Sequence, residues 1–333
     1  MRKFVFRASV FGLLIVGFLG GWSAFLLHLE LATYAREAKM PPDAAYAVCG
    51  DSQTAVGLLP ELWPGFFNFS ISDIRLDQME LKTIDLLERN PGRTKVLLID
   101  ITPRKLVIQD VDVPLKDMRN AGKRFLLHVL HPRESRRSLE GLAVIFRDAI
   151  LVKRTMKFLK ALRKHQRYRS SIGGAGSIAG LTESEVATNR LALLAKPDKM
   201  GFRDHRDSVF SAIGEHADEM SAWGPVTLES KTVACITNMI AIARRQGVTP
   251  VLMTTPWHRE LLSRVSAAQI GNHRQVMREI ARRDGNLPYL DYLEMPFDDG
   301  EWYDGNHLNR HGAVRLTERV RQDVERLCPP IWK

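Results

Sequence analysis

The chain has little cysteine, and this scarcity excludes two classes of protein. Only three cysteines, Cys49, Cys235 and Cys328, occur among the 333 residues. A disulfide scaffold needs more of them, and these three do not fall at the short spacings of a structural zinc site. Cys235 and Cys328 can pair in an oxidising compartment, and the sequence leaves that question open. We expect no metal ion and no cofactor.

Charged residues are missing from one stretch near the N-terminus. Residues 8–27 contain no Asp, Glu, Lys or Arg, whereas Arg2, Lys3 and Arg7 precede them. Twenty residues in a helix reach about 30 Å, which is enough to cross the hydrocarbon core of a membrane. The basic flank predicts a cytoplasmic N-terminus. Residues 1–35 are therefore predicted to hold a cytoplasmic tip and an uncleaved transmembrane signal anchor.

A cleaved signal peptide is the alternative interpretation of this segment. Ala45-Tyr46-Ala47 has the small residues of a cleavage site, but it lies far beyond the apolar run. Cleavage there would leave Ser52, discussed below, almost at the new terminus. The anchor is favoured, and it places the rest of the chain outside the cytoplasm.

Nucleic-acid binding is also disfavoured, because the chain is expected to be exported and has no binding motif. The net charge of +10 and the pI near 9.6 favour contact with membrane head groups or an acidic polymer. A solvated basic surface without a partner is the alternative. The apolar fraction of 45% is ordinary for a packed core and argues against global disorder.

The chain does contain an alternation of short apolar runs and amphipathic segments. The predicted strands lie at 44–49, 66–71, 95–101, 248–254 and 289–292, and the predicted helices at 77–89, 231–246 and 313–327. Apolar runs of this length are typical of strands buried on both faces of a parallel sheet. The pattern predicts an α/β domain at 44–330 behind a linker at 36–43, with its site at the carboxyl ends of the strands.

Two short motifs at opposite ends of this domain carry the candidate chemistry. Gly50-Asp51-Ser52 follows the first predicted strand, and Asp304-Gly305-Asn306-His307 precedes the last predicted helix. A serine is a poor nucleophile unless an imidazole accepts its proton, and a carboxylate can hold that imidazole in the useful tautomer. Together the motifs supply a serine, a histidine and an aspartate.

These motifs resemble those of the SGNH (GDSL-type) hydrolase superfamily, and in particular its membrane-anchored bacterial members of unassigned substrate. The similarity covers roughly residues 46–120 and 247–327 and includes the ending His307-Leu308-Asn309-Arg310-His311-Gly312-Ala313. It implies a flavodoxin-like, three-layer parallel sheet. It also implies that Ser52 is the nucleophile, His307 the general base and Asp304 the orienting acid.

The chain departs from the family pattern in the two blocks that normally complete the oxyanion hole. The resemblance implies a glycine near residues 66–73, where Ser70 or Asp73 stands instead. It implies an asparagine after the strand at 95–101, where Ile101-Thr102-Pro103 is found. The Ser52 amide with a donor near Ser70 or Thr102 is the expected substitute, and a slow or inactive member is the alternative.

Two further regions are candidates for contact with substrate. His258 follows a predicted strand, so it is predicted either to line the substrate pocket or to be a surface-loop histidine. Residues 132–225 are predicted to form a helical, basic insertion that edges the site and sets specificity. Its helix at 153–169 carries eight Lys and Arg residues and can bind an anionic surface or simply present a solvated basic face. The glycine-rich run at 172–177 lacks the lysine of a phosphate loop.

The resemblance and the location together predict a serine esterase that removes O-acyl groups, with acetyl favoured, from a cell-envelope or extracellular polysaccharide. Lipid esters are the next substrate class. The alternatives are an O-acyltransferase for the same substrates and a non-catalytic envelope protein that binds glycan or a partner. The expected place is the bacterial inner membrane, with the α/β domain in the periplasm or outside the cell, where envelope-biosynthesis proteins are possible partners.

Overall fold

A computed structural model describes residues 10, 40, 43–70, 76–107, 182–195 and 225–328 of the chain. The chain divides into two units, residues 1–38 with 117–168 and residues 39–116 with 169–333, and every described residue except Val10 belongs to the second. Apart from Val10, the predicted anchor at 8–27 lies outside the described residues, as do the basic helix at 153–169, the glycine-rich run and Asp73. No helix within the described ranges is long and apolar enough to cross a membrane.

The described part of the second unit is built on one five-stranded sheet. Its strands are β1 (Tyr46–Cys49), β2 (Phe66–Asn68), β3 (Val96–Asp100), β4 (Thr249–Thr254) and β5 (Tyr289–Asp291). All neighbouring pairs are parallel, in the order β2-β1-β3-β4-β5. The chain therefore has the α/β class predicted, and its strand order is the flavodoxin-like one. In that order the switch point lies between β1 and β3, where sites are expected outside the carboxyl ends of the strands.

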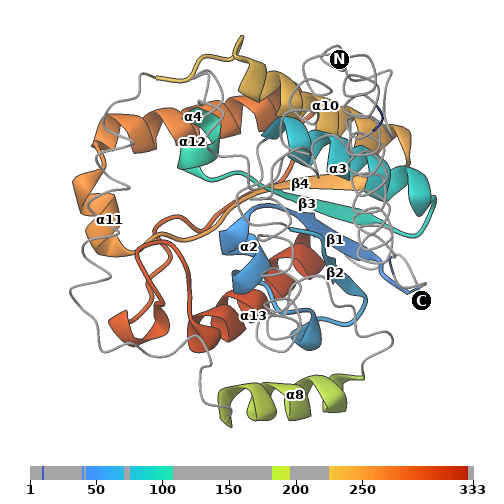
Figure 1. The fold of residues 1–333 in the computed structure, drawn as a ribbon, viewed down its shortest axis with the longest axis vertical. Coiled ribbons are helices and arrows are strands. Elements are labelled where there is room, and N and C mark those ends of the chain that lie inside the picture. The colour runs from blue at the N-terminus through green and yellow to red at the C-terminus, as the bar shows by residue number, and fades with distance from the viewer. Residues whose placement is uncertain are drawn as a thin grey trace. The chain divides into compact units, whose positions relative to one another are not determined.

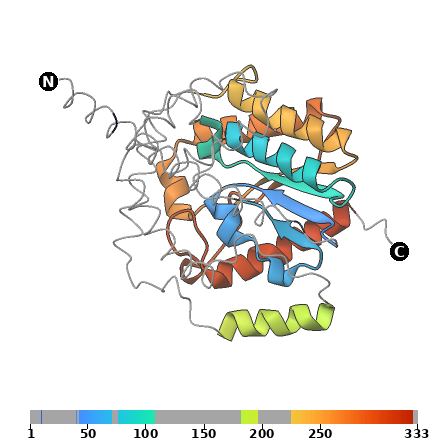
Figure 2. The ribbon, with the colours of Figure 1, turned by 45° about the vertical axis from the view of Figure 1, so that its right-hand side comes forward.

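Helices cover both faces of the sheet (Figure 1). On one face lie α3 (Leu76–Arg89), α4 (Pro103–Val107), α10 (Lys231–Arg245) and α12 (Ala267–Arg283). On the other lie α2 (Ser52–Gly57) and α13 (Arg310–Leu327), with α8 (Glu183–Ala195) packed beyond α13 (Figure 2). The remaining elements are α11 (Arg259–Arg264) and two 3-10 turns, Pro60–Leu62 and Asp299–Glu301.

Side-chain alternation along β1, an interior strand of the sheet, explains why both faces are covered. Tyr46 and Val48 of β1 join the core cluster that includes Leu316 and Val320 of α13. Ala47 and Cys49 are also buried, on the opposite face, because neighbouring side chains of a strand point to opposite sides. Burial on both faces gives the continuous apolar runs seen in the sequence.

The observed helices differ from the predicted ones at several places, because the short helices α2, α4 and α11 were not predicted and two longer helices also differ. The last helix begins at Arg310 rather than at 313, because the Asn309 side chain accepts hydrogen bonds from the amides of His311 and Gly312 and caps it there. Helix α12 was not expected at all. Its buried residues Ile270, His273, Val276, Met277, Ile280 and Ala281 recur at helical spacing, but the many Arg and Gln residues between them lower its apolar character.

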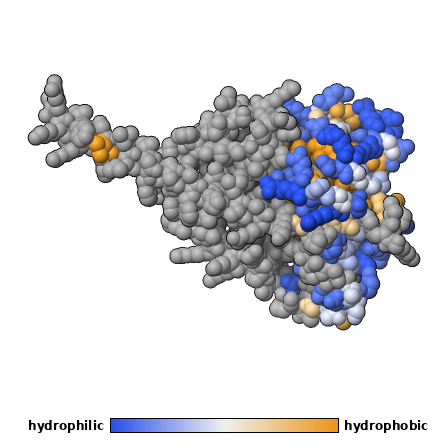
Figure 3. All heavy atoms as spheres, turned by 90° about the vertical axis from the view of Figure 1, so that its right-hand side faces the viewer, coloured by the Kyte–Doolittle hydropathy of each residue, from blue (hydrophilic) through white to orange (hydrophobic). Residues whose placement is uncertain are grey.

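The described surface is mainly hydrophilic on the face shown in Figure 3, with smaller hydrophobic patches. Helix α8, which lies within the predicted insertion, docks through Leu194, which packs on the cluster of Leu59, Leu62, Ala313 and Val314, and through polar contacts. The Asn189 amide donates to the Glu61 carbonyl oxygen, and Arg190 pairs with Glu318 of α13 at 2.5 Å. Residues 183–195 of the predicted insertion are helical, the rest of the insertion apart from residues 182 and 225 lies outside the described ranges, and the insertion itself stays a prediction.

Candidate active site

Ser52 is placed by the turn that joins β1 to α2. It is the first residue of α2, and Asp51 caps that helix by accepting a hydrogen bond of 2.9 Å from the Gln53 amide. Gly50 makes this turn possible. A Cβ atom at position 50 would lie 2.1 Å from Thr54 Oγ1 and 3.1 Å from the Asp100 Cβ, so a larger residue would push α2 away from the sheet. Asp51 and Gly50 therefore act as structural residues that present Ser52 at the edge of the sheet.

Asp304 and His307 lie on a loop that is closed by its own hydrogen bonds. Asp304 Oδ1 accepts from the amides of Asn306 at 3.0 Å and of His307 at 2.8 Å, which is the pattern of an Asx turn. The Tyr303 amide donates to the His307 carbonyl oxygen at 2.9 Å. The motif spacing of three residues thus has a structural cause, because the turn brings the aspartate side chain beneath the imidazole.

Neighbouring elements hold this loop against the sheet. Trp302 and Leu308 form an isolated antiparallel bridge, and the His258 amide donates to the Gly305 carbonyl oxygen at 3.0 Å. Gly312 allows the start of α13 to approach, because a Cβ there would lie 2.5 Å from the Glu301 carbonyl oxygen. The loop is therefore fixed at both ends and in its middle.

The two motifs meet in the arrangement of a hydrolytic triad. His307 Nε2 lies 2.8 Å from Ser52 Oγ, and His307 Nδ1 lies 2.9 Å from each carboxylate oxygen of Asp304. A proton on Nδ1 satisfies the carboxylate, and Nε2 is then free to accept the serine proton. All three side chains are partly buried.

The charge state of Asp304 suits this role. Burial by itself raises the pKa of Asp304, but hydrogen bonds from the His307 ring and from the Asn306 and His307 amides outweigh it. The net effect is a pKa below the ordinary value for an aspartate. Asp304 is therefore ionised at neutral pH and can stabilise a positive charge that develops on the imidazole.

The other predicted site residues lie around this centre in different roles. Ser70 and Thr102 follow β2 and β3, the two strands that flank β1, so both lie at the strand ends where Ser52 lies. Both are buried, and within the described ranges neither hydroxyl oxygen has a hydrogen-bond partner. Asp73, the other candidate in the second block, lies outside the described residues.

His258 is buried and uses both ring nitrogens within the protein. Its Nδ1 accepts a hydrogen bond of 3.1 Å from the Glu260 amide and so caps α11, while Nε2 lies 3.3 Å from Asp299 Oδ1. Its ring makes an edge contact with Trp302, with centroids 5.4 Å apart. The structure thus links His258 to the loop that carries the triad. Contact between His258 and substrate stays a prediction.

The acidic residues next to the triad are engaged in local contacts. Asp298 and Glu301 form a reciprocal capping box, Glu301 also pairs with Arg315, and Asp299 pairs with Arg259. In the part of the chain that the structure describes, no group of three or more His, Cys, Asp or Glu side chains is arranged to hold a metal ion. None of Cys49, Cys235 and Cys328 forms a disulfide, and burial raises the pKa of the Cys49 thiol, which keeps it protonated.

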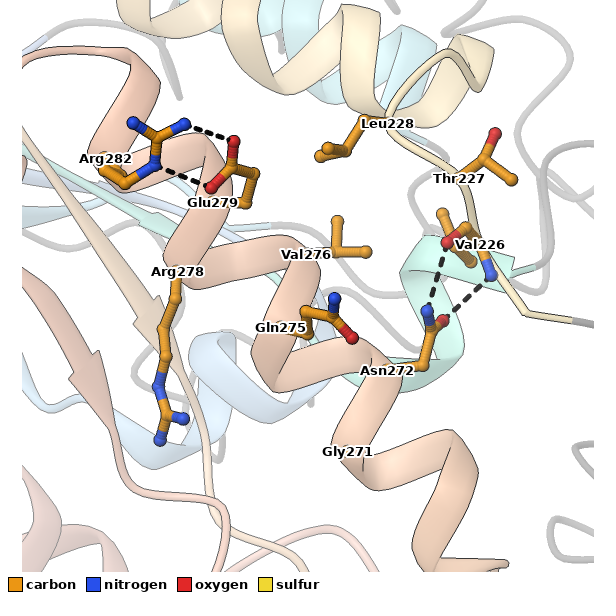
Figure 4. A pocket seen from close by; sticks show the side chains of 10 residues that line it. All are labelled: Val226, Thr227, Leu228, Gly271, Asn272, Gln275, Val276, Arg278, Glu279 and Arg282. Carbon is orange, nitrogen blue, oxygen red and sulfur yellow. Dashed lines mark hydrogen bonds and ion pairs between the residues drawn. The ribbon is translucent and has the colours of Figure 1, made fainter.

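A cavity of about 570 Å³ lies away from these residues, between the segment that leads into α10 and helix α12 (Figure 4). The Asn272 side chain accepts from the Val226 amide at 2.9 Å and donates to its carbonyl oxygen at 3.1 Å, which fixes one wall. Arg282 and Glu279, one turn apart on α12, pair with each other beside the cavity (Figure 4). None of the residues lining this cavity is a predicted site residue.

Several residues that support Ser52 were not identified from the sequence. Asn68 donates to the carbonyl oxygens of Thr54 and Leu58 at 2.9 Å each, and so ties α2 to the end of β2. Asp100 ends β3 and accepts hydrogen bonds from Thr54 and Thr255. The sequence did contain one sign of the role of Asp100, because a single carboxylate at the end of a buried apolar strand needs hydrogen-bond partners.

Comparisons of the chain with protein-family models and with curated protein sequences give no match.

Proposed function

We propose that this chain is an SGNH-like serine ester hydrolase. The observation that carries the proposal is the 2.8 Å contact between His307 Nε2 and Ser52 Oγ, with Asp304 behind the imidazole at 2.9 Å. Support also comes from the place of the three residues, at the carboxyl ends of a parallel sheet in the 2-1-3-4-5 order. The order of the motifs along the chain and the sheet agree with the resemblance drawn from the sequence.

The proposed reaction has two halves. In the first, His307 takes the Ser52 proton, Ser52 Oγ bonds to the ester carbonyl carbon, and the alcohol leaves with the proton that His307 returns to it. In the second, His307 takes a proton from water, and the resulting hydroxide attacks the acyl-enzyme. The carboxylic acid is released and Ser52 regains its proton. The Asp304 carboxylate holds the imidazole and stabilises its charged form.

The negative oxygen of the tetrahedral intermediate needs hydrogen-bond donors. The Ser52 amide is at the first position of α2, where a helix leaves its amides without internal partners. The buried hydroxyls of Ser70 and Thr102, at the ends of the strands beside β1, are the proposed additional donors. One such donor contributes about 3–4 kcal/mol to lowering the barrier. These hydroxyls replace the glycine and asparagine that the family pattern implies.

The proposed substrate is an O-acyl ester, with acetyl favoured, on a cell-envelope or extracellular polysaccharide. The support is the predicted anchor, the expected location outside the cytoplasm and the positive net charge of +10. Transfer of the acyl group to a sugar hydroxyl differs only in the acceptor of the second half-reaction. An acyltransferase therefore uses the same triad.

A direct test uses the full-length chain with a short-chain nitrophenyl ester and with a fluorophosphonate probe. We expect ester turnover and covalent labelling of Ser52, both lost in Ser52→Ala. Labelling without hydrolysis favours the acyltransferase. A transfer assay with an acetylated oligosaccharide as donor and a deacetylated one as acceptor then tests that activity. Absence of both labelling and turnover contradicts the enzyme proposal and favours a non-catalytic glycan-binding protein.

A further inference from the structure

Asp100 is a buried carboxyl group directly behind the helix that carries Ser52. It is 1% exposed at the end of β3. Its Oδ1 accepts from the Thr255 amide at 3.0 Å. Its Oδ2 lies 2.5 Å from Thr54 Oγ1 and 3.2 Å from Thr255 Oγ1. Within the described ranges no cation pairs with Asp100, so hydrogen bonds alone would stabilise a negative charge there.

The hydrogen-bond donors around Asp100 can be assigned, beginning at Trp257. The indole Nε1 of Trp257 can only donate, and it lies 3.3 Å from the Gln53 side chain. The Gln53 carbonyl oxygen must therefore face the indole, because the amide nitrogen would bring two donors together. This fixes the orientation of the Gln53 side chain, which is otherwise ambiguous between oxygen and nitrogen.

The acceptor of the Thr255 hydroxyl proton can then be assigned. Thr255 Oγ1 lies 2.9 Å from the same Gln53 oxygen, and an oxygen with no proton to offer would be repelled there. The single Thr255 hydroxyl proton therefore points to Gln53. The 3.2 Å contact of Thr255 Oγ1 with Asp100 Oδ2 can then be a full hydrogen bond only if Asp100 supplies the proton.

A protonated Asp100 satisfies every contact in this network. Its Oδ2–H donates to Thr255 Oγ1, while a lone pair on the same oxygen accepts the Thr54 hydroxyl proton. Its Oδ1 accepts the Thr255 amide proton. An ionised Asp100 would compete with Gln53 for the Thr255 proton, and one of the two contacts would be lost.

The charges that surround Asp100 favour the neutral acid as well. Burial, followed by the nearby Asp51 carboxylate, raises the pKa of Asp100 to about 7, against the opposing effect of its hydrogen bonds. Lys105 Nζ of α4 lies 3.8 Å from Asp51 Oδ2 and pairs with that carboxylate. His273 of α12 contacts Thr254 rather than Asp100, and burial lowers its pKa to about 3, so it adds no positive charge.

We propose that Asp100 acts as a neutral carboxylic acid that positions the nucleophile helix, and that its ionisation lowers the reactivity of Ser52. The proton on Asp100, at the end of β3, connects this residue to Thr255, which follows β4. Asp100 in turn contacts Thr54, and Thr255 contacts Gln53, so both residues that follow Ser52 in α2 are held by this network. The reactivity part of this inference rests on the proposed function, whereas the protonation of Asp100 does not.

The test therefore has one arm that needs no activity. In the full-length chain labelled with carbon-13 at the aspartate carboxyl groups, the Asp100 signal is identified by its loss in Asp100→Asn. If that variant does not fold, Thr255→Val identifies the signal by shifting it. We expect a protonated carboxyl at pH 6 and a titration midpoint near 7. The Trp257 indole and Thr255 amide signals should move with the same midpoint in the wild type and stay still in Asp100→Asn.

The second arm measures the rate of fluorophosphonate labelling of Ser52 against pH. Asparagine imitates the uncharged state of the acid. Its amide nitrogen can donate to both threonine hydroxyls and its oxygen can accept the Thr255 amide proton, while the Thr54 hydroxyl proton must turn away from position 100. The ratio of the wild-type rate to the Asp100→Asn rate cancels the titration of His307. We expect this ratio to fall about threefold or more between pH 6 and pH 8.5. Asp284→Asn, at the far end of α12, should give a ratio independent of pH.

The outcomes separate this inference from the proposed function. A carboxyl signal that is already ionised at pH 6, or a rate ratio that does not change with pH, overturns the role of Asp100. Absence of labelling in every variant contradicts the enzyme proposal instead. In that case the titrations of the Trp257 indole and Thr255 amide signals alone decide whether the protonated acid positions α2. If these signals do not move with pH, the positioning role of Asp100 is overturned.

Discussion

His307 Nε2 lies 2.8 Å from Ser52 Oγ although 255 positions separate the two residues in the chain. The sheet brings about this meeting, because parallel strands end at the same edge and both residues follow elements that finish there. The contact has the length of an ordinary hydrogen bond between a hydroxyl and an imidazole. Four predictions follow from the surroundings of this pair, besides the experiments given above.

Replacing either member of the pair should remove turnover without unfolding the protein. Ser52→Ala and His307→Ala should each lower kcat on a nitrophenyl ester by about ten-thousandfold or more, because the remaining groups cannot activate a nucleophile. Ser263→Ala, on the exposed helix α11, is the matched control and should keep full activity. Equal loss of activity in the control would contradict the assignment.

Removing the charge of Asp304 should leave the loop folded but disable the imidazole. An asparagine side chain can still accept the His307 amide proton, yet it no longer stabilises a charged ring or enforces its tautomer. By comparison with serine proteases, we expect Asp304→Asn to lower kcat by about ten-thousandfold with little change in KM. Asp298→Asn, six residues earlier in the same loop region, should have a small effect. Near-normal kcat in Asp304→Asn would show that the orienting acid lies elsewhere.

Gly50→Ala should destabilise the protein and reduce its activity together. The added Cβ would lie 2.1 Å from Thr54 Oγ1, so α2 has to move and Ser52 moves with it. Overpacking of this kind costs about 1–3 kcal/mol of unfolding free energy, which urea denaturation can measure. Gly271→Ala is the control. Position 271 lies inside α12 with no atom within 4 Å of the added carbon, and alanine there should stabilise by about 0.5–1 kcal/mol.

The raised pKa of Asp100 predicts a specific dependence of stability on pH. Because the folded-state pKa of about 7 lies above the unfolded value of 3.8, the native state binds this proton more tightly. The resulting stabilisation is fully present below about pH 4 and is lost as the pH rises to 7. Asp100→Asn has no such proton. The unfolding free energy of Asp100→Asn minus that of the wild type should therefore increase by up to about 4 kcal/mol between pH 4 and pH 7.

Urea denaturation of both proteins at several pH values measures this difference directly. Other groups that titrate over the same range contribute equally to both proteins and cancel. A difference in unfolding free energy that stays constant between pH 4 and pH 7 would show that Asp100 has an ordinary pKa.

The sequence by itself determined the strands, the class of the fold and the three residues that we propose as the triad. Apolar runs such as Val96–Asp100 and the periodic helix Leu76–Arg89 are local patterns, and burial on one or both faces leaves a direct trace in residue order. The Asp304 to His307 spacing is local too, because an Asx turn is formed within three residues.

Tertiary structure alone decided how these residues are supported. The link from Asp100 to Gln53 joins positions on β3, β4 and α2 through side-chain hydrogen bonds, and no periodicity in the sequence records such partners. The place of His258 was decided in the same way, because its ring nitrogens are taken up by the α11 amide and by Asp299. Hydrogen-bond partners depend on distances in space, so only the packed sheet and its helices could assign them.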